Sequence, residues 1–274
     1  MNQKTTSKIL RALVYFSAVV TVGILAFIII FIIVKGVPNL SPKLFSWKYT
    51  SENVSMLPSI VNTIYMTFLS LLFALPLGVF AAIYLVEYGK TDNQLVKFVR
   101  LMAETLAGIP SIVYGLFGYL VFGIALGWGY SLLGGALTLA IMVLPTIMRG
   151  TEEALLGVSN TFREGSFGLG AGRLRTVFKV VLPSAMNGIL ASVILSIGRI
   201  VGETASLIYT AGTSPNIPEN VFGSARTLSV HLYVLWSEGF SVGEAYATSV
   251  VLIVLVILLN ALSAYVAKRI NKGK

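Results

Sequence analysis

The hydrophobic positions of this chain fall into long runs that contain no charged residue. The four longest cover residues 12–34, 53–86, 105–148 and 245–267. About 20 apolar residues in a helix cross the ~30 Å hydrocarbon core of a bilayer, so each run is long enough to span a membrane. The run 105–148 has room for two spans, and the sequence GWGYS within it favours a tight turn between them.

This pattern predicts an all-α, polytopic membrane protein with six transmembrane helices. Their expected positions are about 12–34, 58–87, 101–126, 132–149, 184–211 and 245–267. Pro58 suits a helix start, because its missing N–H would be unpaired there in any case, and Pro76 should kink the second helix. The first run is longer than the 7–15 apolar residues of a signal peptide, so we expect a retained helix.

Composition and charge agree with a membrane protein. The chain is 56% hydrophobic and 11% charged, whereas soluble domains are about one-quarter charged. It has no cysteine, which excludes disulfides and cysteine-based metal sites, and its one histidine, His231, is expected at a surface or interface of an outer loop. The net charge of +9 would also fit a nucleic-acid-binding protein, so the distribution of the charges has to decide.

Six helices place both termini on one side of the membrane. Fifteen of the 20 Lys and Arg residues fall on that side, in the termini and in two connecting segments. The positive-inside rule therefore predicts cytoplasmic termini and a multi-pass protein of the cytoplasmic membrane. Nothing in this distribution points to nucleic acid.

The segment 149–183 is the most informative polar stretch. Thr151, followed by two glutamates, predicts one helix start, and Ser159 predicts a second. Gly168 and Gly170 should end the second helix. Gly165 lies in its middle, at a cost of about 1 kcal/mol relative to alanine, which makes sense if another surface approaches the backbone closely. A cytoplasmic loop with two amphipathic helices and no partner is the plain alternative.

The spacing EGS-x-x-x-G, followed after nine residues by V-x-L-P, resembles the EAA loop of ABC-transporter permease subunits, which docks on the ATPase. Gly-Ser stands where the family has Ala-Ala, but both pairs are small. The resemblance implies that the loop couples to the ATPase, with the chain turning into the membrane at Leu182-Pro183. The residues it assigns to this role are Arg163, Glu164, Gly165, Ser166, Gly170, Leu182 and Pro183.

Four longer stretches extend the resemblance: GIPSIVYGLFG (108–118), ALTLAIMVLPTIMRGTEEAL (136–155), GLGAGRLRTVFKVVLPSAMNGI (168–189) and SIGRIVGETASLIYTAG (196–212). Together they look like a permease subunit of the phosphate ABC importer. The last stretch, with SARTLSVHLY (224–233) after it, is more similar to the PstA-type than to the PstC-type subunit. The similarity covers roughly 57–268.

The resemblance implies a type I ABC importer permease (MetI-like) core over 57–268, with a coupling loop at 149–183 and an outer loop at 213–244. Residues 1–56 add the N-terminus, the first helix and an outer loop, and 269–274 form a cytoplasmic tail. The implied location is a bacterial or archaeal cytoplasmic (inner) membrane. The outer loop 213–244 is expected to dock the binding protein.

The implied function is that of a permease subunit that is not itself catalytic. It forms half of a phosphate pathway in the lipid bilayer with a PstC-type permease, two PstB-type ATPases and a PstS-type phosphate-binding protein. The sequence has no Walker A pattern, so this chain should bind no cofactor, and ATP and Mg should belong to the ATPases. A permease for another oxyanion such as sulfate is the nearest alternative. A self-contained channel or ion-coupled carrier is an alternative of another class.

Two pairs of residues are candidates for the substrate pathway. Arg199 and Glu203 are spaced to share one face of the fifth helix, and ionisable groups at that depth normally face a cavity or a partner. The planar guanidinium of Arg199 matches an oxyanion, and Glu203 is expected to hold the geometry of Arg199 or to help gate release. The alternative is a pair that only fixes helix packing. Ser111 and Tyr114 follow Pro110, where a half-helix could direct free N–H groups at an anion, although a simple proline kink is as consistent.

Overall fold

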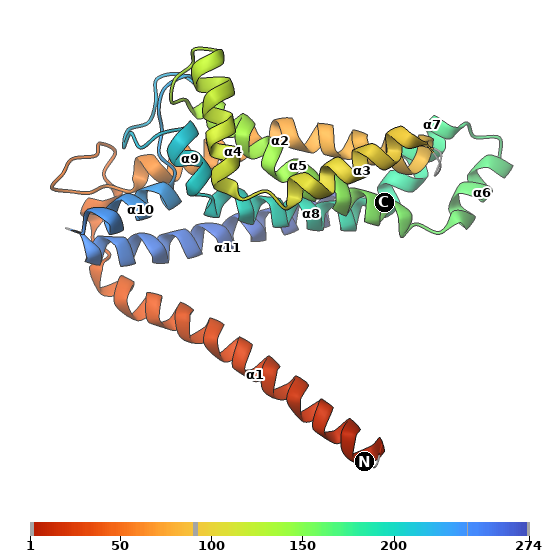
Figure 1. Cartoon of the computed structure of the whole chain (residues 1–274), viewed down its shortest axis with the longest axis horizontal. Helices are drawn as coiled ribbons and strands as arrows, with labels where there is room; N and C mark the ends of the chain where they lie inside the picture. The colour runs from red at the N-terminus through yellow and green to blue at the C-terminus, as the bar shows by residue number, and fades with distance from the viewer. Residues whose placement is uncertain (1–2, 90–92, 240, 273–274) are drawn as a thin grey trace.

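The computed structural model describes residues 3–89, 93–239 and 241–272, and this part of the chain contains helices and no strand. Helices α2, α5, α8 and α11 run alongside one another as the body of the molecule (Figure 1). The helices are α1 (Gln3–Gly36), α2 (Leu57–Ile83), α3 (Gln94–Ala107), α4 (Ser111–Gly118), α5 (Leu132–Leu156), α6 (Asn160–Gly168), α7 (Arg173–Thr176), α8 (Leu182–Gly202), α9 (Ala205–Thr210), α10 (Leu228–Glu238) and α11 (Val242–Lys272). Short 3₁₀ turns, η1 (Val37–Asn39) and η2 (Pro42–Phe45), follow α1, and π-helical turns η3 (Tyr84–Tyr88), η4 (Tyr119–Ala125) and η5 (Val177–Val181) extend or join longer helices.

Five helical stretches are long and apolar enough to cross a membrane, which confirms the all-α multi-pass prediction. They are Leu10–Asn39, Leu57–Tyr88, Leu132–Leu156, Arg173–Gly202 and Val242–Val266. A sixth candidate is broken: α3 and the α4–η4 stretch meet at a 103° bend. The span predicted over 101–126 is therefore bent into two helices, and the second begins at Ser111, where a half-helix was predicted. Pro110 has no N–H to donate and disfavours the α conformation at Ile109, so the helix stops and starts again at Ser111.

The core lies around α5, which packs along α2 and α8. Leu139, Val143 and Ile147 on α5 are completely buried. A Cβ atom at Gly78 on α2 would come within 2.8 Å of the Ile147 side chain, so the glycine permits the close contact of these two helices. Small residues at helix crossings serve membrane proteins in this way, because lipid offers no hydrophobic drive for helix association.

Both ends of the predicted loop 149–183 turn out to be helical. Helix α5 continues to Leu156, and Thr151 is buried inside it with its hydroxyl unpaired rather than capping a helix start. On the other side the helical stretch runs from Arg173 to Gly202, so Leu182-Pro183 lie within it. Pro183 is accommodated in the first turn of α8, directly after the π-helical turn η5.

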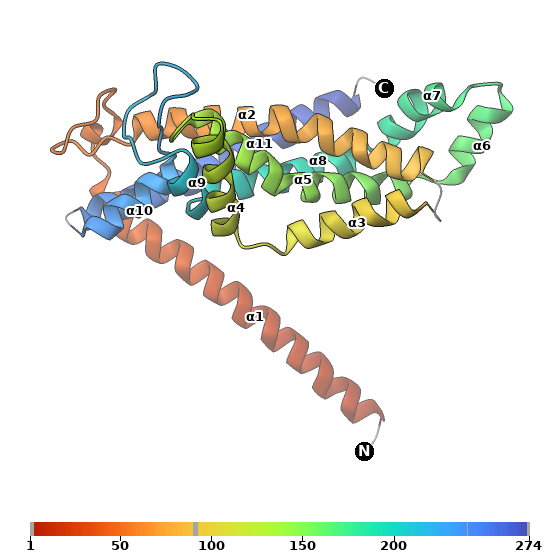
Figure 2. The same cartoon turned by 45° about the horizontal axis from the view of Figure 1, so that its top comes forward.

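The connections separate to two ends of the molecule. Helices α6 and α7 and the C-terminal end of α11 lie at one end, and α10 with the loop after α1 lies at the other (Figures 1 and 2). The predicted outer loop 213–244 contains helix α10. Helix α1 leaves the bundle obliquely at the α10 end, where Phe31 packs edge-on against Tyr246 of α11 with ring centroids 6.1 Å apart.

Candidate functional site

The fifth predicted span breaks where its two charged residues lie. Helix α8 ends at Gly202, Glu203 has an extended backbone (φ −71°, ψ 130°), and α9 begins at Ala205. The continuous helix expected over 184–211 is therefore wrong, and Arg199 and Glu203 do not share a face of one helix. Among the described residues, the ion pairs join Arg100 to Glu152, Arg149 to Glu104 and Arg163 to Glu87, and none joins Arg199 to Glu203.

Glu203 holds the break in place. Its Oε1 accepts a hydrogen bond from the Ser206 backbone N–H at 3.0 Å, which caps the start of α9. Its backbone oxygen accepts from the Ser229 hydroxyl at 2.6 Å, which ties the break to α10. Glu203 thus holds the backbone between α8 and α9 through its hydrogen bonds with Ser206 and Ser229, and not by pairing with Arg199. The serines were not foreseen, since nothing in their spacing distinguishes them.

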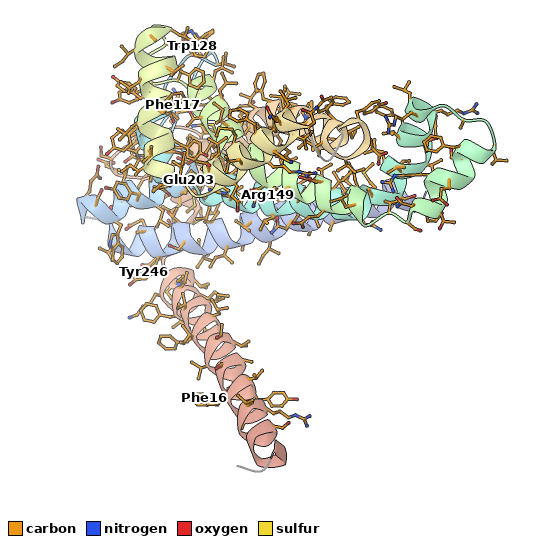
Figure 3. The ribbon with its side chains drawn as sticks, turned by 45° about the vertical axis from the view of Figure 1, so that its right-hand side comes forward. Phe16, Phe117, Trp128, Arg149, Glu203 and Tyr246 are labelled. Atoms are coloured by element: carbon orange, nitrogen blue, oxygen red, sulfur yellow. The ribbon has the colours of Figure 1, made fainter. Side chains whose placement is uncertain are left out.

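The second pair of pathway candidates lies next to this break. Tyr114 on α4 is buried, and its hydroxyl donates a 2.7 Å hydrogen bond to the Leu106 carbonyl of α3, across the bend. Helix α4 packs on α9, and Figure 3 shows Glu203 beside the end of α4. Ser111, the first residue of α4, is partly buried.

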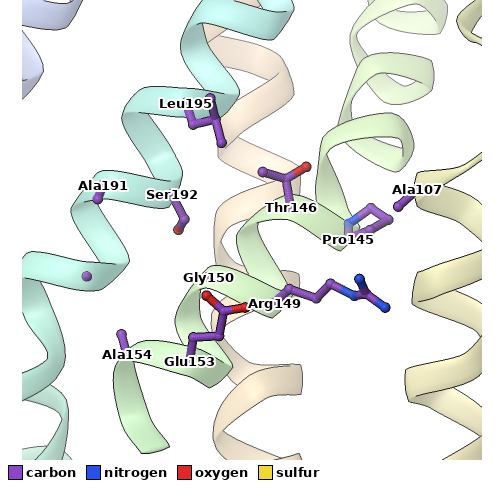
Figure 4. A pocket seen from close by; sticks show the side chains of 11 residues that line it. Ala107, Pro145, Thr146, Arg149, Gly150, Glu153, Ala154, Ala191, Ser192 and Leu195 are labelled. Carbon is purple, nitrogen blue, oxygen red and sulfur yellow. The ribbon is translucent and has the colours of Figure 1, made fainter. Parts of the chain in front are cut away.

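A cavity of about 700 Å³ lies between α5 and α8, on the side of Arg199 that leads toward α6. Gly188, Ser192 and Leu195 line it from α8 (Figure 4). Arg199 follows these residues at helical spacing on the same face, about 6 Å beyond Leu195 along the axis. The α8 lining of the cavity thus ends at Leu195, about one helical turn before Arg199. Sequence reasoning missed this wall, because its small residues carry no chemical signal of their own.

The α5 wall of the cavity carries charge. Arg149 and Glu153 line it, one helical turn apart. Arg149 pairs with Glu104 of α3 at 3.5 Å, and both side chains are well exposed. Glu104 thus connects α3 to α5 through this ion pair. Arg149 thus supplies a cation to the lining of the cavity, where Glu153 also lies and Glu104 pairs with it.

The second helix of the coupling loop is confirmed as α6. The Ser159 hydroxyl accepts a hydrogen bond from the Thr161 N–H, and Gly170, with φ +81°, lies just past the helix end. None of the residues of α6 is buried, and Phe162 and Phe167 present exposed rings. A Cβ atom at Gly165 would meet no other atom within 4 Å, so its outer face is open. Exposed apolar surface around an open glycine is the character of a docking face.

Some of the residues assigned to coupling face outward from the chain, and others contact the rest of the chain. Glu164 and Gly165 are exposed, whereas Arg163 is partly buried against Glu87, with Nη2 2.6 Å from Oε1. The Ser166 hydroxyl lies 2.8 Å from that of Thr176 on α7, so it also faces its own chain. The loop therefore has an outward face for a partner and an inward face that anchors it. Glu87 was not foreseen, because it lies 76 residues from Arg163 in sequence.

A buried polar cluster lies at the opposite end of the molecule. Arg226 is 3% exposed and lies over the Tyr49 ring, 4.5 Å from its centroid. His231 is completely buried, with its ring edge-on to the same tyrosine at 6.2 Å. His231 was expected at a surface or interface, but it lies buried within this chain, because the loop after α1 covers α10. Burial, together with the charge of Arg226, lowers the pKa of His231 to about 3.

This histidine should make stability depend on pH. The unfolded chain has a His pKa of about 6.5, so folding disfavours the proton, and the stabilisation is complete above pH 6.5 and is lost as pH falls below it. We expect the free energy of unfolding to fall through this group as pH drops below 6.5, with a slope that approaches about 1.4 kcal/mol per pH unit near pH 5. Chemical denaturation in detergent at several pH values, with His231→Gln for comparison, checks this. Equal slopes for the two proteins in this pH range would contradict it.

Comparisons with known proteins agree with these features. Residues 74–272 match the family model described as binding-protein-dependent transport system inner membrane component. A probable ABC transporter permease protein, YqgI of Bacillus subtilis (strain 168), is 34% identical, with 99% of this chain and 98% of the relative covered. The phosphate transport system permease protein PstA of Pasteurella multocida (strain Pm70) is 33% identical, with 94% and 93% covered.

The fold also has counterparts among solved structures. A chain of a bacterial alginate ABC transporter, solved with an alginate pentasaccharide-bound periplasmic protein, superimposes with a TM-score of 0.73. The match covers 98% of this chain and 96% of that one at 15% identity, so it bears on the fold alone. The matched sequence family, the helical membrane fold and the exposed α6 with its EAA-type spacing lead to one assignment. This chain belongs to the family of inner-membrane permease components of binding-protein-dependent ABC transporters.

Proposed function

We propose that this chain is the PstA-type permease subunit of an ATP-driven phosphate importer. The observation that carries the proposal is the position of Arg199, near the end of α8 and one helical turn beyond Leu195, which lines the cavity between α5 and α8. A permanently charged guanidinium with fork-like donors suits a tetrahedral oxyanion, and its place near the C-terminal end of a helix favours the cation. The phosphate permease named among the relatives supports phosphate over other oxyanions.

In this proposal phosphate passes Arg199 and enters the cavity between α5 and α8. Glu203 holds the end of α8 by capping α9, and Tyr114 supports the neighbouring bend between α3 and α4. Ser111, at the start of α4, remains a proposed pathway residue. The small side chains of α8 keep the route open toward the end of the molecule that carries α6.

The partners follow from the same proposal. A PstC-type permease supplies the other half of the pathway, two PstB-type ATPases bind at the α6 end, and a PstS-type binding protein docks on the loops at the α10 end. ATP and Mg are held by the ATPases. The lipid bilayer is the cytoplasmic membrane of a bacterium or archaeon, with both termini in the cytoplasm, as the distribution of Lys and Arg favours.

Purification of the complex followed by reconstitution tests this function. A tagged chain isolated from its native membrane should bring with it a second permease, an ATPase and a phosphate-binding protein. Vesicles containing this complex should accumulate radioactive phosphate only with ATP and binding protein, and excess sulfate or molybdate should not compete. Competition by sulfate would indicate another oxyanion, and phosphate flux through vesicles holding this chain alone would indicate a carrier or channel.

A further inference from the structure

The guanidinium of Arg163 ties α6 to the end of α2. Its Nε donates to both carboxylate oxygens of Glu87, at 3.1 and 3.4 Å, and its Nη2 donates to Oε1 at 2.6 Å. The two side chains are only 14% and 8% exposed. Arginine–carboxylate pairs with two-point contact fix orientation as well as distance. The start of α6 is therefore held in one orientation relative to the π-helical turn η3 that ends α2.

The same guanidinium also reaches the end of α5. Its Nη2 donates to the Leu155 carbonyl at 2.9 Å, and its Nη1 donates to the Val158 carbonyl at 2.8 Å. Carbonyls in the last turn of a helix have no partner within the helix. A cation there is favourable both as a hydrogen-bond donor to these carbonyls and as a charge at the negative end of the helix dipole. One side chain thus joins three elements: α6, the end of α5 and the end of α2. Burial of the charge is compensated by this complete set of acceptors.

Two neighbouring contacts hold the far side of the loop. The Arg173 guanidinium lies over the Tyr88 ring of η3, 5.3 Å from its centroid. The Ser166 and Thr176 hydroxyls connect α6 to α7, which continues into α8. The inward face of the coupling loop is thus fastened to the ends of α2, α5 and α8. Two of these helices, α5 and α8, form the wall of the inner cavity.

We propose that Glu87 and Arg163 form a positioning pair that transmits movement of α6 to α2 and α5. The inference rests on the proposed function, in which an ATPase pushes or pulls on the outward face of α6. Coupling between distant sites needs a stiff connection between the elements that move. A largely buried ion pair held by several hydrogen bonds provides such a connection. Without the Glu87–Arg163 pair, the ATPase would still dock on the exposed face of α6. Movement of the ATPase would then shift α6 alone and would not move the helices that line the cavity.

The test uses the whole transporter complex in lipid vesicles and measures ATP hydrolysed per phosphate transported. Glu87→Gln removes the charge but keeps a similar shape, and we expect the ratio to rise by about threefold or more, within the range of mutations that alter coupling. Glu87→Asp keeps the charge on a shorter stem and should lie between this variant and the wild type. The ATPase should copurify with both variants in normal amounts.

Glu152→Gln is the matched control. It breaks the Arg100–Glu152 pair, which is also 2.6 Å long but joins α3 to α5 and does not touch α6. The control should keep the wild-type ratio. An unchanged ratio in Glu87→Gln, or an equal rise in the control, would overturn the proposal. If Glu87→Gln does not assemble, the ratio of Glu87→Asp decides in the same way. Failure of the proposed function can be told apart from these outcomes, because in that case the wild-type complex itself would not transport phosphate.

Discussion

Replacing Arg199 with glutamine is expected to abolish phosphate uptake while the ATPase subunits stay bound. Glutamine keeps a polar side chain but loses the permanent charge and the fork of donors that fit an oxyanion. Removing one member of a close charge contact reduces binding by several kcal/mol, so uptake should fall by about 100-fold or more. The measurement is the initial rate of radioactive phosphate entry into vesicles that contain the purified complex.

Two further variants make this result specific. Arg199→Lys keeps the charge as a single point, so partial uptake with a raised KM for phosphate is expected. Arg100→Gln removes an arginine of α3 that pairs with Glu152, and neither residue lines the cavity, so uptake should stay near the wild-type rate. If Arg199→Gln transports phosphate normally, Arg199 has only a packing role, and the pathway lies elsewhere.

The sequence predicted best what depends on local composition. Long charge-free runs predicted the membrane spans, because the thickness of the bilayer sets the number of apolar residues that a helix needs to cross it. The limits of α6 were also predicted, since a capping serine at its start and glycines at its end act within a few residues. Pro110 was recognised as the start of a half-helix, but the 103° bend places α3 and α4 in different directions.

The break after α8 was not predictable in the same way. The sequence around Glu203 contains nothing that forbids a helix, and the spacing to Arg199 suggested one. The extended backbone is stabilised by Ser206 three residues on and by Ser229, 26 residues away. The contact with Ser229, which is distant in sequence, outweighs local helix propensity, because propensity is only a weak preference. The same reason explains why Thr151, with good capping chemistry, lies buried inside α5.

The functional contacts that were missed are all between distant parts of the chain. Glu87 looked like the ordinary polar end of a span until the fold placed it beside Arg163. His231 lies under a loop that follows α1, so its burial depends on how the two ends of the chain pack. Periodicity reports which face of an element is apolar, but it does not say which element will cover that face. The chemical type of each residue was evident, and its partner was not.

A bulky side chain at position 165 is expected to release the ATPase from the permease. Gly165 lies on the exposed face of α6, where a Cβ atom would meet nothing within 4 Å, so Gly165→Leu should leave the fold of this chain intact. Overfilling a close contact costs about 1–3 kcal/mol, which corresponds to roughly a 5- to 150-fold loss of affinity. The measurement is the amount of ATPase that copurifies with the tagged chain, together with ATP-dependent uptake.

Comparing a small with a large side chain at position 165 distinguishes an effect on ATPase docking from an effect on the stability of α6. Gly165→Ala should retain the ATPase and also favour α6 by about 1 kcal/mol, because alanine is the better helix former. Gly23→Leu in α1 is the control, since that glycine is also helical with open surroundings and lies far from α6. Loss of the ATPase with leucine at 165 alone would locate the contact at this glycine. Retention of the ATPase and of uptake with leucine there would show that the open face of α6 is not where the partner binds, and the inward ties of Arg163 and Ser166 would then serve only to hold the loop.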